Sequence, residues 1–272
     1  MDNFGSSTDV ERRFSGLARL YGDDAPERLA NSHIGVAGLG GVGSWCAEAL
    51  ARSGVGNLTL IDLDHIAESN INRQVHALTD TLGQSKVEAM AQRIRGINPA
   101  CRLTNIDDFV APENVRTVFG EGVRLIIDCT DQISAKVAMI LEARHRRIPI
   151  IVCGGAGGKT DLPALKVDDL AFSTNDALLA KLRNVLRRNH DFPKGSVSGK
   201  ARRRVAKMGV RVIWFDQPAV LPAAWVEAEA PAGALQGLTC AGYGSAMALT
   251  AAMGLAAAND AIQQVLRKNA KS

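Results

Sequence analysis

The stretch "VAGLGGVGSWCAEALARSGVGNLTLIDLD", residues 36–64, decides the fold. A short apolar run, 34–38, leads into a glycine turn, and helix formers then continue to a stop signal at Ser53-Gly54. Glycine permits a tight turn and lets backbone N–H groups approach a phosphate at the positive end of a helix. The turn contains Gly38, Gly40, Gly41 and Gly43.

A second apolar run, 57–62, ends at Asp62, nineteen residues after Gly43. A carboxylate at that point can accept hydrogen bonds from ribose hydroxyls. The stretch therefore predicts a strand–turn–helix–strand unit that binds a nucleotide. Both a nicotinamide dinucleotide and ATP fit these features.

Strands and helices continue to alternate as far as residue 154. The sequence predicts helices over 84–95, 112–119 and 133–144, and strands over 101–107, 123–129 and 148–154. This alternation favours an α/β fold of the Rossmann-like, doubly wound type, with a mostly parallel sheet covered on both faces. Beyond it we expect an antiparallel C-terminal extension, with strands 164–170 and 209–215 around a helix at 175–188, and then a long C-terminal helix.

Composition limits the function classes. The 272-residue chain has a net charge of only +4, so a nucleic-acid role needs a local basic patch. None of the five cysteines forms a CxxC pair, which excludes a disulfide framework and a four-thiolate zinc site. The first residues lack the apolar core of a signal peptide, and we expect a cytoplasmic protein.

One stretch near the C-terminus allows a second interpretation. Residues 230–259 carry no charge, and 238–258 are long enough to span a bilayer. Alanine and glycine dominate there, and they drive membrane insertion weakly. We expect a buried or subunit-interface helix, with membrane association as the alternative.

The residues after Asp62 distinguish the two nucleotides. Asn70, Arg73 and Lys86 follow the ribose-binding strand. Hydride transfer needs no cations beside the phosphates, whereas displacement at phosphorus does, because charge builds on the phosphate oxygens. "DCTDQ" (128–132) ends the fourth strand, where Asp131 can hold Mg²⁺ and Asp128 can cap the following helix. The sequence thus favours ATP.

These motifs resemble one superfamily. GxGGxG, DxDxxxxSNxNRQ, GxxK and DCTD, over roughly residues 10–160, form the pattern of the adenylating enzymes that include the ubiquitin-activating enzymes and the activators of bacterial sulfur carriers. The resemblance implies ATP-dependent adenylation of a carboxylate, with Mg²⁺ bound at Asp131. It implies that the nucleotide is bound by Gly38, Gly40, Gly41, Gly43, Asp62, Asp64, Asn70, Arg73, Gln74, Lys86 and Asp131.

The same resemblance implies a homodimer. In that superfamily an N-terminal arginine reaches into the site of the other subunit. The candidates here are Arg13 and Arg19, of which Arg19 is preferred. The catalytic residues implied are therefore Arg73, Lys86, Asp131 and Arg19, together with the thiol of Cys240 discussed below.

Further segments resemble the tRNA threonylcarbamoyladenosine dehydratase family, among them "NRQVHAL" (72–78), "GGAGGKTDLPALKVDDLA" (154–171) and "CAGYGSA" (240–246). The resemblance implies one ThiF-type adenylating domain over 1–272, with a nucleotide-binding part (10–160) and a substrate, tRNA and dimer part (161–272). It implies ATP-dependent cyclisation, with loss of water, of the modified adenosine at tRNA position 37. The alternative is an activator of a ubiquitin-like sulfur carrier, against which the missing zinc cysteines count.

The implied partner is tRNA, and we expect no DNA partner. If the substrate is tRNA, part of the protein surface should be basic. Residues 181–204 hold nine Lys or Arg and one acid, Asp191, around a basic loop near 188–207. An ordinary solvated face is the alternative. The residues expected to contact tRNA are Lys181, Arg187, Arg188, Lys194, Lys200, Arg202, Arg203 and Arg204.

Three further expectations concern a thiol, a monovalent cation and a partner protein, and the sequence supports them less directly. Cys240 is either an acyl-accepting nucleophile or a buried structural thiol, because intramolecular ring closure needs no thioester. The carbonyls of "GGAGG" (154–158) can hold a monovalent cation, Na⁺ or K⁺. A cysteine-desulfurase or sulfur-acceptor system is a possible partner that the resemblance suggests.

Overall fold

The computed structural model describes residues 10–194, 205–221 and 243–267. The strands are β1 (His33–Ala37), β2 (Asn57–Ile61), β3 (Arg102–Ile106), β4 (Leu125–Asp128), β5 (Ile150–Cys153), β6 (Leu165–Asp169) and β7 (Arg211–Phe215). The helices are α1 (Val10–Tyr21), α2 (Ala25–Ala30), α3 (Gly43–Arg52), α4 (Lys86–Ile97), α5 (Val115–Phe119), α6 (Ile133–Arg146), α7 (Ala177–Asn189) and α9 (Met247–Leu266). Short 3₁₀ turns are η1 (Glu68–Asn70), η2 (Thr79–Thr81), η3 (Leu162–Ala164) and η4 (Leu170–Phe172).

The described strands form one sheet in the order β3-β2-β1-β4-β5-β7-β6. All neighbours are parallel except β6 and β7, which pair antiparallel with Val167 opposite Ile213. From β1 the chain adds β2 and β3 on one side, and it then returns to the other side of β1 to form β4. Ligands bind at this change of strand order in doubly wound folds. The predicted Rossmann-like fold, its antiparallel extension and its long C-terminal helix are confirmed.

Two apolar layers enclose the sheet. On one face Leu50 of α3, Met90 of α4 and Met253 of α9 pack in one cluster with strand residues such as Val36 and Ile127. On the other face α5, α6 and α7 pack against the alternate strand residues, which include Ile126 and Trp214. Both faces of the central strands are therefore covered, which explains their continuous apolar sequences.

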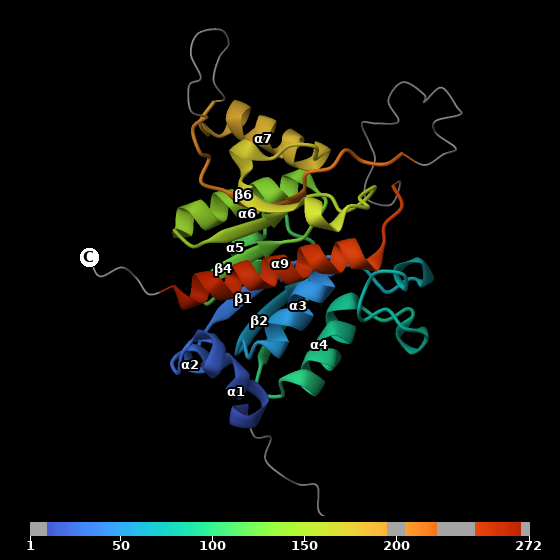
Figure 1. Ribbon diagram of the computed structural model, residues 1–272, viewed down its shortest axis with the longest axis vertical. Helices are drawn as coiled ribbons and strands as arrows, with labels where there is room; N and C mark the ends of the chain where they lie inside the picture. Colours follow the sequence, from blue (N-terminus) through green and yellow to red (C-terminus); the bar gives the residue numbers. More distant parts are fainter. Residues whose placement is uncertain (1–9, 195–204, 222–242, 268–272) are drawn as a thin grey trace, which may run out of the picture.

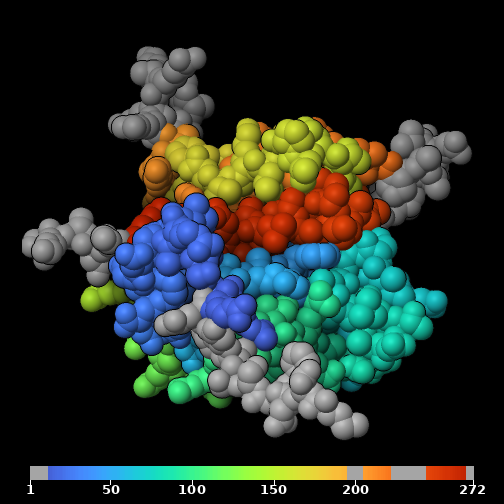
Figure 2. All heavy atoms as spheres, turned by 60° about the horizontal axis from the view of Figure 1, so that its bottom comes forward, coloured from blue at the N-terminus to red at the C-terminus, as the bar shows by residue number. Residues whose placement is uncertain are grey.

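Helix α9 crosses the sheet directly beside α3 (Figure 1). At Gly254 the two helices approach so closely that a Cβ atom would lie 2.3 Å from the carbonyl oxygen of Val42. The outer side of α9 forms a band across one face of the molecule (Figure 2), where Leu255 and Asn259 are exposed. No helix of the described chain, α9 included, has the length and apolarity needed to cross a membrane. Helix α9 packs its small and apolar residues against α3 and the sheet, and its one acidic residue, Asp260, pairs with Arg211 of β7 at 2.6 Å.

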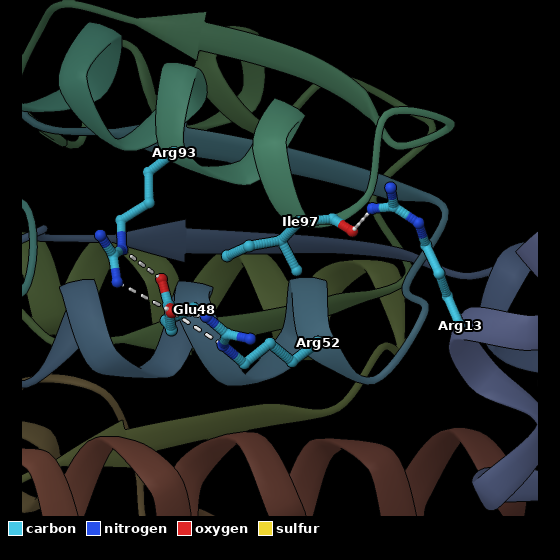
Figure 3. A network of polar contacts seen from close by, with 5 residues as sticks. All are labelled: Arg13, Glu48, Arg52, Arg93 and Ile97. Carbon is cyan, nitrogen blue, oxygen red and sulfur yellow. Dashed lines mark hydrogen bonds and ion pairs between the residues drawn. The ribbon is translucent and has the colours of Figure 1, made fainter. Parts of the chain in front are cut away.

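A buried carboxylate joins α3 to α4. Glu48 of α3 accepts hydrogen bonds from Arg52 of the same helix at 2.8 Å and from Arg93 of α4 at 2.6 Å and 3.2 Å. In Figure 3 both guanidinium groups converge on this side chain, and Arg13 of α1 reaches the carbonyl oxygen of Ile97 at the end of α4. These contacts fix α4 relative to the helix that follows the glycine turn.

We expect Glu48→Gln to lower the free energy of unfolding by about 1–2 kcal/mol, because three charge-assisted hydrogen bonds from two arginines lose their anion at a buried site. Glu88→Gln is the matched control, since Glu88 is exposed on α4 and pairs with Arg95 at 3.3 Å. That control should cost less than about 0.5 kcal/mol. Urea denaturation measures both, and equal effects would contradict the assignment of Glu48 as a helix clamp.

His76 lies buried in the long connection between β2 and α4, and neither ring nitrogen has a hydrogen-bond partner among the described residues. Burial, with smaller contributions from Lys86 and Arg93, lowers the pKa of His76 from 6.5 to about 4. Protonation therefore favours the unfolded chain, and stability is lost as pH falls from about 6.5 toward 4.

We expect the free energy of unfolding of the wild-type protein to fall by about 2 kcal/mol between pH 7 and pH 5 because of His76. The His76→Gln variant should not show this loss, because glutamine does not titrate. Parallel pH profiles of unfolding for the two proteins would refute this expectation.

Candidate active site

A cavity of about 600 Å³ lies at the carboxyl ends of the central strands. The glycine turn, the end of β2, the loop after β4 and the start of α9 all contribute to its walls. The predicted nucleotide-binding residues that line it are Gly38, Gly40, Gly41, Asp62, Asp64, Asn70, Arg73, Gln74, Lys86 and Asp131. Gly43 does not line the cavity.

Two glycines of the turn are required by backbone geometry. Gly38 has a φ of +83°, which L side chains rarely adopt. A Cβ on Gly43 would lie 1.7 Å from the carbonyl oxygen of Gly38, so Gly43 lets α3 begin against the end of β1. The helix N-terminus is thereby brought to the cavity, where its N–H groups favour an anion.

Asp62 is tied to the glycine turn. Its carboxylate accepts the backbone N–H of Leu39 at 2.5 Å and that of Asp64 at 2.9 Å. Burial raises the pKa of Asp62, and the nearby ammonium of Lys86 opposes that rise. The side chain is thus oriented at the end of β2, where a ribose would lie.

Lys86, the first residue of α4, supplies a buried cation. Its side chain is 7% exposed, and its Nζ lies 2.6 Å from Asp64 and 3.7 Å from Asp62. The side chain of Asp64 is 73% exposed. An arriving polyphosphate can therefore take over the ammonium while Asp64 turns to solvent.

Arg73 lies over the glycine turn. Its Nη1 donates to the carbonyl oxygen of Ser69 at 2.7 Å and to Asn72 at 2.9 Å. The indole of Trp45 donates to the Arg73 carbonyl oxygen at 2.9 Å, which fixes the backbone. Arg73 and Lys86 thus bring two positive charges to one cavity.

The two acidic residues of the DCTD motif differ in role. Asp128 is fully buried and outside the cavity lining, and it accepts the backbone N–H and the hydroxyl of Thr130 at 3.0 Å and 2.8 Å. It also pairs with buried Lys136 at 3.2 Å. Burial raises the pKa of Asp128, while Lys136 opposes that rise. Asp128 therefore shapes the loop that carries Asp131, and it does not cap α6, whose N-cap is Gln132.

Asp131 is exposed at the mouth of the cavity. The described residues contain no group of three or more His, Cys, Asp or Glu side chains arranged to hold a metal. Mg²⁺ is commonly bound through one or two carboxylates together with substrate phosphates and water. A single carboxylate beside a cavity lined by Arg73 and Lys86 is compatible with that mode.

Several other site residues predicted from the sequence lie elsewhere. Arg19 lies in the last turn of α1 and is absent from the cavity of its own chain, as is Arg13, which donates to the carbonyl oxygen of Ile97. Lys181, Arg187 and Arg188 lie on α7, and Lys194 follows that helix. Lys200, Arg202, Arg203, Arg204 and Cys240 fall outside the described residues.

The lining also contains residues that sequence reasoning missed. Asp108, Phe109 and Val110 follow β3, Ser245 lies just before α9, and Thr250 lies in the first turn of that helix. Phe109 is 53% exposed and places an apolar ring at the wall of the cavity. The only signal in the sequence was an apolar residue, Phe109, shortly after a strand. The same pattern occurs in ordinary surface loops, so it does not identify a site residue.

The comparisons with known proteins agree with this geometry. A family model described as the ThiF family matches residues 13–272. The tRNA threonylcarbamoyladenosine dehydratase of Escherichia coli (strain K12) is 42% identical over 268 residues, which cover 96% of each chain. The enzyme of that name from Haemophilus influenzae is 40% identical over 95% of each chain.

A solved structure gives the same relationship. The crystal structure of the E. coli dehydratase in complex with ATP matches with a TM-score of 0.82 at 40% identity, covering 95% of this chain and 96% of that one. The complex of the same enzyme with AMP has an equal TM-score. The chain therefore belongs to the ThiF family and, within it, to the group of tRNA threonylcarbamoyladenosine dehydratases.

Proposed function

We propose that this protein uses ATP to activate the threonyl carboxylate of threonylcarbamoyladenosine at tRNA position 37, and that the activated group then cyclises. The observation that carries the proposal is the pairing of a ribose-binding carboxylate, Asp62, with a cation-lined phosphate region at Arg73 and Lys86 in one cavity. A hydride-transfer enzyme has no need for that arrangement. The relatives named dehydratases, one solved with ATP and with AMP, supply the substrate.

The first step makes the carboxylate a good electrophile. A carboxylate oxygen attacks the α-phosphorus, the bond from that phosphorus to the bridging oxygen breaks, and pyrophosphate leaves with the electron pair. Arg73 and Lys86 neutralise the charge that grows on the phosphate oxygens. Asp131 would hold Mg²⁺, which would supply positive charge to offset the negative charge of the phosphates.

The second step closes the ring. The ureido oxygen or nitrogen attacks the acyl carbon of the mixed anhydride, AMP leaves, and the ureido group releases one proton. Nucleophile and electrophile belong to one side chain, so alignment gives a high effective molarity. The net change in the tRNA is loss of one water. This route needs no thioester, which leaves Cys240 without a required role.

We infer four further properties of this protein. A homodimer would bring Arg19 or Arg13 of one subunit to the other, and Arg19 is preferred because Arg13 already bonds to Ile97. The sheet and α9 combine both halves of the chain in one core, which supports a single domain over 1–272. A cation at the GGAGG carbonyls and a sulfur-transfer partner stay predictions.

Purified protein with Mg·ATP and tRNA carrying threonylcarbamoyladenosine should convert that nucleoside to a product lighter by one water. Mass spectrometry of nucleosides, prepared under mild, non-alkaline conditions, measures the change. Absence of that product would refute the assignment. Adenylation of a carrier with a Gly-Gly C-terminus would instead support the alternative function, activation of a sulfur carrier.

Lys86→Ala should reduce tRNA-dependent release of AMP by about 10²-fold, because the chain loses one preorganised charge at the phosphates. Arg95→Ala on the exposed side of the same helix is the matched control and should retain activity. Circular dichroism verifies that both variants are folded. Equal activity of Lys86→Ala and the control would exclude Lys86 from the reaction.

A combined variant, Lys181→Ala, Arg188→Ala and Lys194→Ala, should weaken tRNA binding and leave ATP binding unchanged. Each lost phosphate contact should reduce the slope of log affinity against log salt by about 0.7–0.9, depending on whether the contacted RNA is single- or double-stranded. Fluorescence anisotropy at several salt concentrations measures that slope. An unchanged slope would show that this part of α7 and its flank do not contact RNA.

A further inference from the structure

A second cavity of about 400 Å³ adjoins the nucleotide cavity. The two share Asp131, Gly157 and Leu178 in their linings. The rest of its lining comes from the GGAGG loop, Lys159, residues 173–176, the first half of α7, Ala219 and Tyr243. Its volume lies in the range that holds a small organic group.

Lys159 gives this cavity a buried positive charge. The residue is 6% exposed, and its ammonium donates to the carbonyl oxygens of Asn175 and Gln217. No carboxylate of the described residues lies within ion-pair distance of it. Burial lowers the pKa of Lys159, and Asp176 and Asp216 oppose that shift from a distance. A buried ammonium bonded only to neutral groups is a costly arrangement that an anionic ligand would relieve.

Arg183 of α7 adds a second cation to the lining. Its Nη1 donates to the carbonyl oxygen of Ser173 at 2.8 Å and to the hydroxyl of the same residue at 2.7 Å. It too has no ion-pair partner in the part of the chain that the structure describes. No carboxylate of the described residues therefore neutralises either side chain.

The buried carboxylate of the lining is already used. Asp176 caps α7 by accepting the N–H of Leu179 at 2.9 Å, and its other oxygen accepts the N–H of Gly155 at 2.8 Å. Asp131 is exposed at the junction with the nucleotide cavity, where the family pattern places Mg²⁺. The interior of the second cavity thus favours an anion.

We propose that the cavity of Lys159 and Arg183 is the acceptor pocket, which binds the anionic threonylcarbamoyl side chain and directs its carboxylate toward the nucleotide at the Asp131 junction. This inference rests on the proposed function and assigns the substrate its place. A side chain that enters here meets the nucleotide cavity at Gly157, two residues before Lys159. Helix α7 also connects the pocket to the basic residues Arg187 and Arg188 at its other end, so the anticodon loop would follow this helix.

The test uses N6-threonylcarbamoyladenosine and its methyl ester, which lacks the negative charge, in the presence of a non-hydrolysable ATP analogue. Wild-type protein should bind the acid at least tenfold more tightly than the ester. Lys159→Gln should lose that preference, and Ala180→Trp, which fills the pocket, should weaken both ligands. Ala30→Trp, on the exposed end of α2, is the matched control. Affinity for the ATP analogue should be equal in all four proteins.

An acid preference that Lys159→Gln retains, or full binding by Ala180→Trp, would overturn the proposal. If the wild-type protein converts tRNA but binds neither nucleoside, steady-state kinetics with tRNA decide: kcat/KM of Ala180→Trp should fall at least tenfold at constant KM for ATP, and unchanged kinetics would overturn the pocket. Failure of the wild-type protein to dehydrate tRNA refutes the proposed function alone, since the binding measurements stand separately.

Discussion

The ammonium of Lys86, buried between Asp62 and Asp64, is the interaction on which the cavity depends. Its place requires α4 to begin beside the end of β2, because Lys86 is the first residue of that helix. The Glu48 contacts join α4 to α3, and α3 in turn packs against α9 at Gly254. The Lys86 ammonium is thus held at the cavity by a series of contacts that ends at the C-terminal helix.

The same series explains why α9 is so apolar. Where the helix passes the backbone carbonyl of Val42, only glycine fits, and that residue is Gly254. Its buried side contributes Met253, Ala257 and Ala261 to the core. The part of α9 before Asp260 carries no charge, which allowed the membrane interpretation. It carries none because it packs closely against both the sheet and α3. Thr250, from the first turn of this helix, then reaches the cavity wall.

Local signals were sufficient for much of the fold and for the nucleotide cavity. The glycine turn and Asp62 sit at strand ends, so the topology of a parallel sheet brings them together. Helix 112–119 was predicted too long, since Asn114 accepts the N–H of Ala111 and holds residues 111–114 as a turn before α5 begins at Val115. Contacts between elements that are distant in the sequence could not be predicted from local patterns. A lysine such as Lys136 within a helix is normally exposed to solvent, yet Lys136 is fully buried against Asp128.

The loops after β4 and β5 carry the most consequential of these hidden contacts. Lys136 donates to the carbonyl oxygen of Cys153 at 2.9 Å and pairs with Asp128, so one side chain fixes the ends of both strands. The loop after β4 presents Asp131, and the loop after β5 presents the GGAGG segment and Lys159. A buried pair is weak support for stability, because both charges lose their hydration. Its value here is geometric: it sets the spacing between the two loops that bound both cavities, and with it the path from acceptor to phosphorus.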